Sequence, residues 1–500
     1  MIANRKHLDN ELNTEHLQTG LKGRSVRGGV VTLASQGTQF LIQTVATVVL
    51  ARELPPSDFG IIAMVTVVTG LAMAVADLGL TEATIQRKEI THDQVTSLFW
   101  ITVAIGAGLT LITASLAPVL AWFYKEPRLF AVTLVSSVTF LMGSLRGQTD
   151  ALLRRQMRYG YLGFKDVAAN AIAVPVAIAI AWRGGGYWAL VALPLTVNFL
   201  HMIMSWMMVR WRPGLPRRNA NVRSMVAFGG NVAGSYLIFT INRSVDNALI
   251  GWYWGSAPLG LYSRAYNLLL LPLRQLSGPM AGVAVPTFSR IHSDQERFAR
   301  YYLATINLMM WIIAPMFGFL FVAAKPVIVF VLSAKWEESA PVFQMLSISA
   351  PGQVLLDSTV WLLISRGQST RLLRLLLCTT PFIIGSFVIG LPFGIKAVAF
   401  SYSMMLLIIL PWMLRYAFRD TQLTLRKLAR ALVFPIATGL TGVLFAEITS
   451  HYILTPNVIL QFFVVGLGFV IAILAAMLVR PVREEFLSFK KLIADLRGAN

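Results

Sequence analysis

Long apolar runs separated by short polar loops make up most of the chain. Each run is roughly 20 residues long, which is the length that an α-helix needs to cross the hydrocarbon core of a bilayer. The runs lie at about 29–50, 59–80, 95–120, 128–146, 162–182, 186–209, 226–253, 260–287, 300–323, 340–364, 372–393, 397–418, 431–452 and 457–479. The pattern predicts an all-α polytopic membrane protein with about 14 transmembrane helices.

A sparse internal repeat divides this array. When the sequence is shifted by 200 positions, similar residues coincide: Leu50 with Ile250, Phe59 with Leu259, Gly60 with Gly260, and Ile61 with Leu261. The repeat predicts two pseudo-symmetric six-helix lobes followed by two additional helices. The expected division is a cytoplasmic N-terminal tail at 1–24, lobes at 25–210 and 225–420 joined by a cytoplasmic linker at 211–224, the additional helices at 421–480, and a cytoplasmic C-terminal tail at 481–500.

Composition agrees with a membrane protein, because 56% of the residues are hydrophobic, 13% are charged and the mean hydropathy is +0.65. The net charge of +20 does not indicate nucleic-acid binding, since the basic residues are scattered through short loops between apolar runs. Of the 43 Lys and Arg residues, 33 lie in the tails, in one set of loops or at the span ends beside them, 7 lie in or beside the opposite loops, and the other 3 are Arg243, Arg264 and Arg274. This asymmetry predicts that both termini are cytoplasmic.

Catalytic and metal-binding signatures are missing from the sequence. It contains no P-loop, GxSxG or HExxH motif, its single cysteine is Cys378, and its six histidines show no metal-ligand spacing. We therefore expect neither an enzyme nor a bound metal or cofactor.

One face of the first predicted helix is polar, because Thr32, Gln36, Gln39, Gln43 and Thr47 follow one another at intervals of three or four residues. Positions 200 residues later include Tyr236, Arg243 and Asn247. If the lobes are related, Gln43 and Arg243 both line the space between them. Alternatively, the glutamines bond between helices and Arg243 pairs with Asp246.

Charged residues within or near the spans are further site candidates, because a bilayer tolerates charge only where it is paired or wet. Arg243 is the first candidate for binding an anionic substrate. Arg264 and Arg274 follow it, with Asp246 and Asp357 as alternative structural partners. Asp77, Asp246 and Asp357 are the candidates for ion coupling. The candidates for binding sugars through amide and aromatic groups are Gln39, Tyr236 and Tyr266.

Five stretches of the sequence closely resemble the Wzx-type polysaccharide flippases of the multidrug, oligosaccharidyl-lipid and polysaccharide exporter superfamily, especially the colanic-acid-type flippases. They are LARELPPSDFGIIAM at 50–64, DLGLTEATIQRKEIT at 77–91, LRRQMRYGYL at 153–162, VDNALIGWYWGSAPLGLYSRAYNLLLLPLRQLSGPM at 245–280, and VPTFSRI at 285–291.

The resemblance implies a flippase in the bacterial inner membrane that moves a polyprenyl-diphosphate-linked oligosaccharide between leaflets for exopolysaccharide or lipopolysaccharide synthesis. A polysaccharide polymerase and assembly proteins would be its partners, beside membrane lipids. The alternative is a multidrug or other small-molecule exporter of the same superfamily. The alternating-access cycle expected of either would move the two lobes about a central site.

The charge asymmetry gives a direct test of topology. Reporter fusions placed after Arg218 and after Glu338 should report cytoplasm and periplasm respectively, because the first follows a basic loop and the second a loop poor in Lys and Arg. The reverse result at both sites would overturn the predicted topology.

Overall fold

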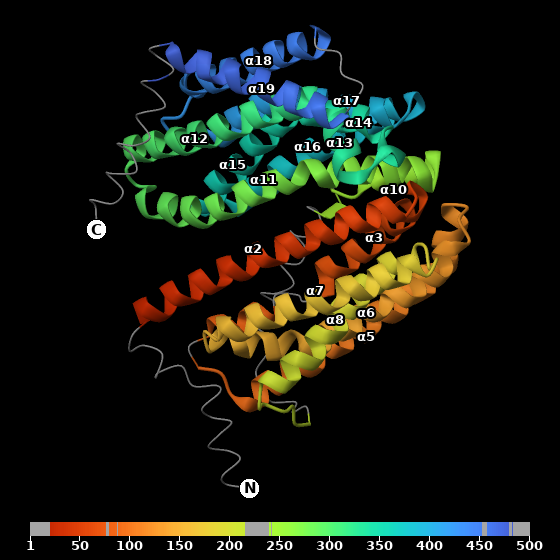
Figure 1. Cartoon of the computed structure of the whole chain (residues 1–500). Coiled ribbons are helices and arrows are strands. Elements are labelled where there is room, and N and C mark those ends of the chain that lie inside the picture. The colour runs from red at the N-terminus through yellow and green to blue at the C-terminus, as the bar shows by residue number, and fades with distance from the viewer. Residues whose placement is uncertain are drawn as a thin grey trace. The chain divides into compact units, whose positions relative to one another are not determined.

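The computed structural model describes residues 21–76, 80–87, 89–215, 240–241, 243–452, 458–479 and 483, and every regular element among them is a helix (Figure 1). The chain divides into two compact units, Met1–Gly260 and Leu261–Asn500. The predicted site residues Asp77 and Tyr236 lie outside the described residues, as do most of the two predicted tails and of the predicted linker.

The helices of the first unit are α2 (Leu21–Glu53), α3 (Pro56–Ala76), α4 (Leu80–Gln86), α5 (His92–Phe123), α6 (Arg128–Arg155), α7 (Tyr159–Trp182), α8 (Trp188–Met208) and α10 (Val245–Trp254). The next helix, α11 (Ser256–Ile291), begins in this unit. Neighbours along the chain pack as antiparallel pairs, α5 with α6 and α7 with α8, while α2 packs along α7 and α6 along α8. This arrangement brings α2, α6 and α7 around one interior space.

The second unit contains the rest of α11, then α12 (Gln295–Val322), α13 (Ala324–Leu332), α14 (Ser339–Ser347), α15 (Ala350–Ser365), α16 (Ser369–Gly390), α17 (Ile395–Ala417), α18 (Leu425–Tyr452) and α19 (Val458–Leu478), with short 3-10 turns at Ala334–Trp336 and Leu391–Phe393. The two additional helices expected at 421–480 correspond to α18 and α19. They pack on each other, and α18 packs on α12, where glycine at 318 and 439 lets the two backbones approach closely.

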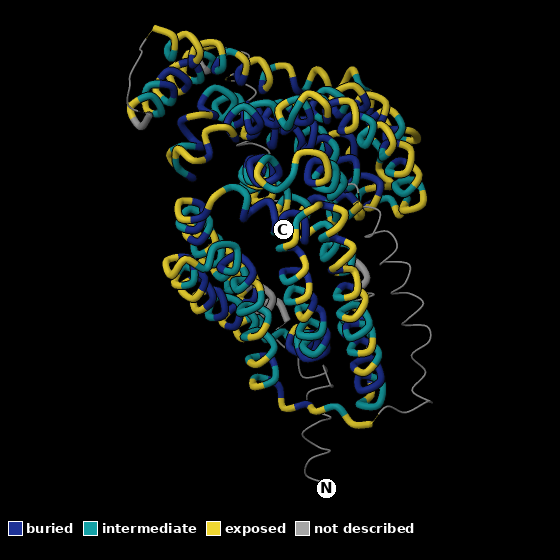
Figure 2. Tube along the Cα trace, turned by 90° about the vertical axis from the view of Figure 1, so that its right-hand side faces the viewer, coloured by how far each residue is buried: buried dark blue, intermediate teal, exposed yellow. Residues whose placement is uncertain are grey.

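Ten helices in the described part of the chain are long and apolar enough to cross a membrane. They are α3, α5, α6, α7, α8, α11, α12, α16 with its following 3-10 turn, α17 and α18. Large apolar side chains such as Leu111, Ile408 and Leu444 point outward on them and are 68%, 71% and 64% exposed (Figure 2 shows exposed positions in yellow). The predicted total of 14 spans remains a prediction. The polar face of α2 lowers the hydropathy of that helix, although it extends over the whole predicted run 29–50.

One predicted span is not a single continuous helix. The run 340–364 forms two helices, α14 and α15, which are separated at Ile348 and Ser349. Pro351 lies in the first turn of α15, where its missing N–H costs nothing; in an uninterrupted helix it would leave a carbonyl one turn earlier without a donor. Hydrophobicity alone did not reveal this break.

The run expected as one helix over 226–253 is also interrupted in its described part. Arg243 and Ser244 form a turn, and α10 begins only at Val245. Asp246 lies in the first turn of α10, where its carboxylate accepts a hydrogen bond from the backbone N–H of Asn247 at 2.7 Å. An acidic side chain at this position stabilises the start of a helix by interaction with its free N–H groups.

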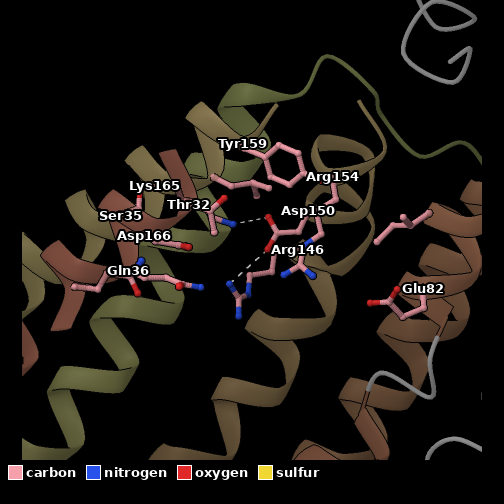
Figure 3. A pocket seen from close by; sticks show the side chains of 14 residues that line it. Thr32, Ser35, Gln36, Glu82, Arg146, Asp150, Arg154, Tyr159, Lys165 and Asp166 are labelled. Atoms are coloured by element: carbon pink, nitrogen blue, oxygen red, sulfur yellow. Dashed lines mark hydrogen bonds and ion pairs between the residues drawn. The ribbon is translucent and has the colours of Figure 1, made fainter. Parts of the chain in front are cut away.

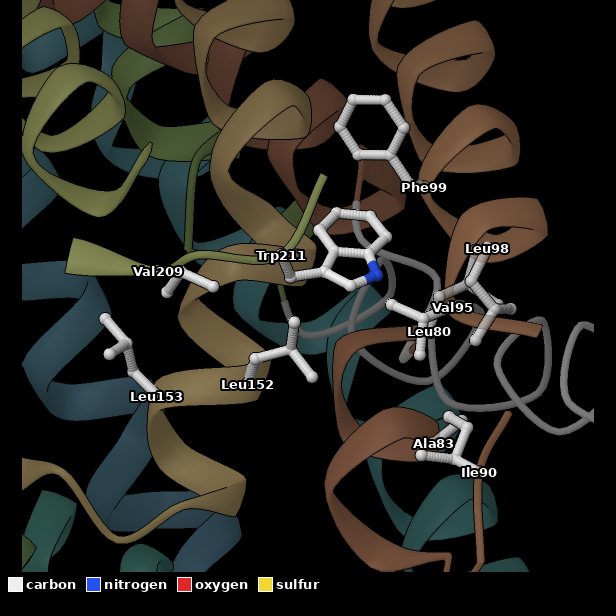
Figure 4. Close-up of a cluster of buried hydrophobic side chains, with 10 residues drawn as sticks. All are labelled: Leu80, Ala83, Ile90, Val95, Leu98, Phe99, Leu152, Leu153, Val209 and Trp211. Atoms are coloured by element: carbon white, nitrogen blue, oxygen red, sulfur yellow. The ribbon is translucent and has the colours of Figure 1, made fainter. Parts of the chain in front are cut away.

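The segment that follows α8 is extended and anchored to the start of α5. Trp211 is fully buried in an apolar cluster with Leu98, Phe99 and Leu152 (Figure 4). Its indole N–H donates to His92 Nδ1 at 3.1 Å. The start of α5 is itself fixed by a capping box between Thr91 and Gln94. The chain therefore leaves α8 along a defined path.

The positions matched by the repeat occupy equivalent places. Helices α3 and α11 begin 200 residues apart, at Pro56 and Ser256. A Cβ added to Gly60 would lie 1.7 Å from the Ser256 carbonyl oxygen, and one added to Gly260 would lie 1.8 Å from the Pro56 carbonyl oxygen. The contact is reciprocal, and each backbone occupies the space that a side chain of the other would need. Only glycine fits at either position.

Replacing Gly60 should therefore destabilise the protein. Gly60→Ala forces a methyl group into a backbone carbonyl that cannot rotate away, and overpacking of this kind costs about 1–3 kcal/mol. The midpoint of thermal unfolding in detergent should fall. Gly108→Ala on α5 is the matched control, because an added Cβ there has no neighbour within 4 Å. Equal midpoints for Gly60→Ala and the wild type would contradict the steric account.

Candidate functional site

A polar pocket of about 580 Å³ lies within the first unit, between α2, α4, α6 and α7 (Figure 3). Its lining consists of Thr32, Ser35, Gln36, Gln39, Glu82, Ile85, Arg146, Asp150, Arg154, Tyr159, Leu162, Gly163, Lys165 and Asp166. The helices that carry these residues are mostly apolar, so a pocket with six charged side chains is costly unless the charges are paired or hydrated. Such a concentration of charge makes this pocket the candidate functional site of the first unit.

Helix α6 supplies three charged groups on one face. Arg146, Asp150 and Arg154 are spaced four residues apart, which aligns them along the helix. An Arg146 guanidinium nitrogen lies 3.5 Å from Asp150 Oδ2. Arg154 is exposed in the pocket, and its guanidinium forms no ion pair with any residue that the structure describes.

The second cation of the network is deeply buried. The Lys165 side chain on α7 is only 2% exposed, and its Nζ lies 2.5 Å from Asp150 Oδ1. The hydroxyl of Ser205 on α8 donates to the same carboxylate oxygen at 2.6 Å and accepts from Lys165 Nζ at 3.1 Å. Asp150 thus binds an ammonium and a hydroxyl through one oxygen and faces a guanidinium with the other.

A second chain of contacts runs beside the first. Arg146 donates to His201 Nδ1 at 2.9 Å, and His201 Nε2 lies 3.3 Å from Asp166 Oδ1. The Asp166 carboxylate accepts a side-chain hydrogen bond from Gln39 of α2. The two chains connect four helices, α2, α6, α7 and α8, through polar contacts.

Close packing of α2 on α7 holds the glutamines at the pocket. A Cβ added to Gly163 would lie 2.1 Å from the Ser35 hydroxyl oxygen, and one added to Gly28 would lie 2.6 Å from the Tyr159 ring. Because both glycines lack side chains, α2 lies close enough for Gln36 and Gln39 to line the pocket. The polar face predicted on this helix therefore points into the pocket over its first half.

A smaller pocket of about 220 Å³ adjoins the first. It is bounded by α3, α4, α5 and α6, and it shares Glu82, Arg146, Asp150 and Arg154 with the larger pocket. The charged face of α6 therefore lies between two hollow regions. A ligand bound at these arginines has room on both sides.

Of the predicted site residues that the structure describes, Gln39 lines this pocket. Gln43 lies one turn further along α2 and is exposed, Arg243 is exposed in the turn before α10, and Asn247 is partly buried on α10. Arg264, Tyr266, Arg274 and Asp357 belong to the second unit, the first three on α11 and the last on α15. The roles predicted for these residues remain predictions.

None of the six charged residues that line the pocket is among the site residues predicted from the sequence. Lys165 and Asp166 were already inside the predicted span 162–182, which was a signal that they had to be paired or wet. The predicted span 128–146 ends at Arg146, whereas α6 continues to Arg155. Asp150 and Arg154 thus fall in a predicted loop and Arg146 at its edge, although their four-residue spacing is typical of a helical face.

The arrangement suits an anionic ligand that also carries hydroxyl groups. Arginine matches phosphate oxygens with two parallel donors, and lysine contributes a compact positive charge. Amide and hydroxyl groups from Gln36, Gln39 and Ser35 can bond to sugar hydroxyls. No group of His, Cys, Asp and Glu residues suited to a metal ion occurs among the described residues.

Removing one partner of the buried ion pair should destabilise the protein. Lys165→Met leaves Asp150 without its nearest cation, and breaking a buried pair in this way costs about 3–5 kcal/mol. The double variant Lys165→Met with Asp150→Asn removes both charges and should regain part of the lost thermal stability. Midpoints of thermal unfolding in detergent measure both effects, and a single variant as stable as the wild type would show that the pair is not structural.

Comparison with known proteins agrees with this architecture. The chain is 22% identical over 358 residues to the teichuronic acid biosynthesis protein TuaB of Bacillus subtilis (strain 168), covering 71% of this chain and 72% of TuaB. It is 23% identical over 306 residues to the lipopolysaccharide biosynthesis protein WzxC of Escherichia coli (strain K12), covering 60% and 61%. The solved structure of the lipid II flippase MurJ in an inward closed conformation has the same fold, with a TM-score of 0.71 and 12% identity over 91% of this chain and 99% of MurJ.

A family model described as polysaccharide biosynthesis protein matches residues 49–341, which is more than half of the chain. The apolar helices and the transporter fold make the chain a multi-pass membrane protein. The chain belongs to the polysaccharide biosynthesis protein family.

Proposed function

We propose that this protein is a flippase that moves a polyprenyl-diphosphate-linked oligosaccharide from the cytoplasmic to the periplasmic leaflet of the bacterial inner membrane. The saccharide unit then serves exopolysaccharide or lipopolysaccharide synthesis, with a polysaccharide polymerase and assembly proteins as partners. The family assignment and the names of the relatives, which include a lipopolysaccharide biosynthesis protein and a lipid II flippase, support the proposal.

The polar pocket of the first unit is the main structural support for this proposed function. Arg146, Arg154 and Lys165 place three cations around a space of about 580 Å³. A diphosphate head group must lose water when it enters a membrane protein, and cations that are already positioned compensate for that loss. The sugars require hydrogen-bonding groups, which Gln36 and Gln39 supply, while the lipid chain stays in the bilayer beside the apolar outer surface.

Under the predicted topology, the ends of α6 and α7 next to the pocket face the cytoplasm. Arg146 lies nine residues before the end of α6, which is about 13 Å along the helix. The pocket would then open toward the leaflet in which the substrate is made. Transfer would follow an alternating-access cycle of the two predicted six-helix lobes, with both termini cytoplasmic.

The proposed function also includes roles for the predicted site residues that lie outside this pocket. Arg243, Arg264, Arg274 and Tyr266 would contact the substrate at later stages of its path. Asp246 and Asp357, with Asp77, would take part in ion coupling. The boundaries 25–210, 225–420 and 421–480 are the proposed limits of the two lobes and the additional helices.

Transport in proteoliposomes tests the proposal. The purified protein should move a fluorescent short-chain prenyl-diphosphate-linked disaccharide across the bilayer, measured as the fraction of label that an added quencher reaches. Arg154→Ala should lower the initial rate about tenfold, since it removes a charge-assisted contact to phosphate. Arg300→Ala, which removes an exposed arginine of α12 outside the pocket, should leave the rate unchanged.

A wild-type protein that moves a lipophilic cationic dye but not the saccharide lipid would contradict the proposal and favour a small-molecule exporter. Equal rates for Arg154→Ala and the wild type, at equal amounts of folded protein, would remove this pocket from the substrate path.

A further inference from the structure

The charged side chains that line the pocket cancel one another. Arg146, Arg154 and Lys165 contribute three positive charges, and Glu82, Asp150 and Asp166 contribute three negative charges. A diphosphate ester carries at least two negative charges near neutral pH. If all three carboxylates kept their present positions and charges, the occupied pocket would hold a net negative charge in a region of low dielectric constant, which is strongly unfavourable.

One carboxylate contacts two of the three cations that line the pocket. Asp150 Oδ1 lies 2.5 Å from Lys165 Nζ, and Asp150 Oδ2 lies 3.5 Å from Arg146. Ser205 adds a hydrogen bond at 2.6 Å to the same carboxylate. Asp150 therefore occupies one donor of Lys165 and lies beside a guanidinium nitrogen of Arg146, where a phosphate oxygen would compete with it.

The other two carboxylates do not hold the cations in this way. Asp166 contacts His201, at 3.3 Å, and Gln39. Glu82 is exposed and forms no ion pair with any residue in the described part of the chain. Only Asp150, among the described carboxylates of the pocket, has both a lysine and an arginine within 4 Å.

We propose that Asp150 is a resident counter-anion, which the diphosphate of the substrate displaces from Lys165 and Arg146. This role of Asp150 rests on the proposed function. In the empty pocket the carboxylate keeps the buried ammonium charged and in place. When a diphosphate arrives at the exposed Arg154, its oxygens replace those of Asp150 on the two deeper cations, and the carboxylate turns away toward water in the adjoining pocket.

The exchange makes Asp150 a determinant of specificity. A neutral glycolipid has no charge with which to displace a carboxylate, and a monoanion offers fewer oxygens than the three cations can bind. A diphosphate can contact Arg154 through one phosphate and the Lys165 and Arg146 pair through the other. The same carboxylate competes with the bound phosphate, so it also limits how tightly the substrate is held.

The test measures binding of inorganic pyrophosphate to the purified full-length protein in detergent, in magnesium-free buffer. Calorimetry gives the dissociation constant, and the rise in unfolding midpoint with ligand gives a second measure. Asp150→Asn should bind pyrophosphate about tenfold more tightly than the wild type, because it removes a competing like charge while keeping the shape of the side chain. A residue with only a structural role would not increase affinity when replaced.

Asp166→Asn is the matched control. It removes the same charge from the same pocket but leaves the contacts of Lys165 and Arg146 intact, so its affinity should change much less than that of Asp150→Asn. The double variant Asp150→Asn with Lys165→Met should lose the gain, since the released cation is gone. If the Asp150→Asn protein does not accumulate, Asp150→Ser, which removes the same carboxylate, takes its place in every comparison.

Two outcomes would overturn the inference in different ways. Equal pyrophosphate affinity in the wild type, Asp150→Asn and Asp166→Asn, together with weaker binding by Arg154→Ala, would reject the displacement of Asp150 while leaving the pocket as the head-group site. No binding of pyrophosphate by any variant would reject both the displacement and the assignment of the head group to this pocket.

Discussion

A charged side chain inside a bundle of apolar helices is stable only beside a counter-charge, a hydrogen-bonding partner or water, and the first unit is arranged to meet that requirement. The ammonium of Lys165 on α7 reaches the carboxylate of Asp150 on α6 and the hydroxyl of Ser205 on α8. Three helices must keep their register for these contacts to persist. The interactions that compensate the charges therefore also fix the walls of the pocket.

The distribution of polar and apolar surface in the first unit matches a ligand with two ends. Polar groups gather in the interior, while the outward positions of α5 carry exposed apolar residues such as Leu111. A lipid-linked saccharide presents the same division, with a charged and hydroxylated head on an apolar chain. An uncharged pocket could accept the sugars, but it could not hold the diphosphate away from water.

Hydrophobic periodicity predicted most of the helices, since membrane-spanning segments need length and apolarity above all. The repeat was also informative: the starts at Pro56 and Ser256, and the glycines at 60 and 260, have equivalent surroundings in the structure. What hydrophobicity could not give was the continuation of α6 through Arg146, Asp150 and Arg154. A charge ends an apolar run in sequence, whereas in three dimensions a partner on another helix allows the run to continue.

The break between α14 and α15 shows the complementary limit. Its 25-residue run, 340–364, is apolar enough to suggest one helix, whereas the chain forms two, with Pro351 in the first turn of the second. Among the predicted site residues, Gln39 lines the candidate pocket, and the sequence indicates it because a regular polar stripe on a helix is visible without knowledge of any partner. Lys165, which has to be understood together with Asp150 and Ser205, was not.

The contact between Arg146 and His201 has a consequence for the imidazole itself. A guanidinium can only donate, so His201 Nδ1 must accept, and the single ring proton of the neutral imidazole must reside on Nε2, toward Asp166. The ring is thus held in one tautomer by an arginine that also faces the ligand space. Should Arg146 turn to a bound anion, Nδ1 would lose its donor, and the nitrogen resonances of this one histidine would register occupancy of the pocket without any label on the substrate.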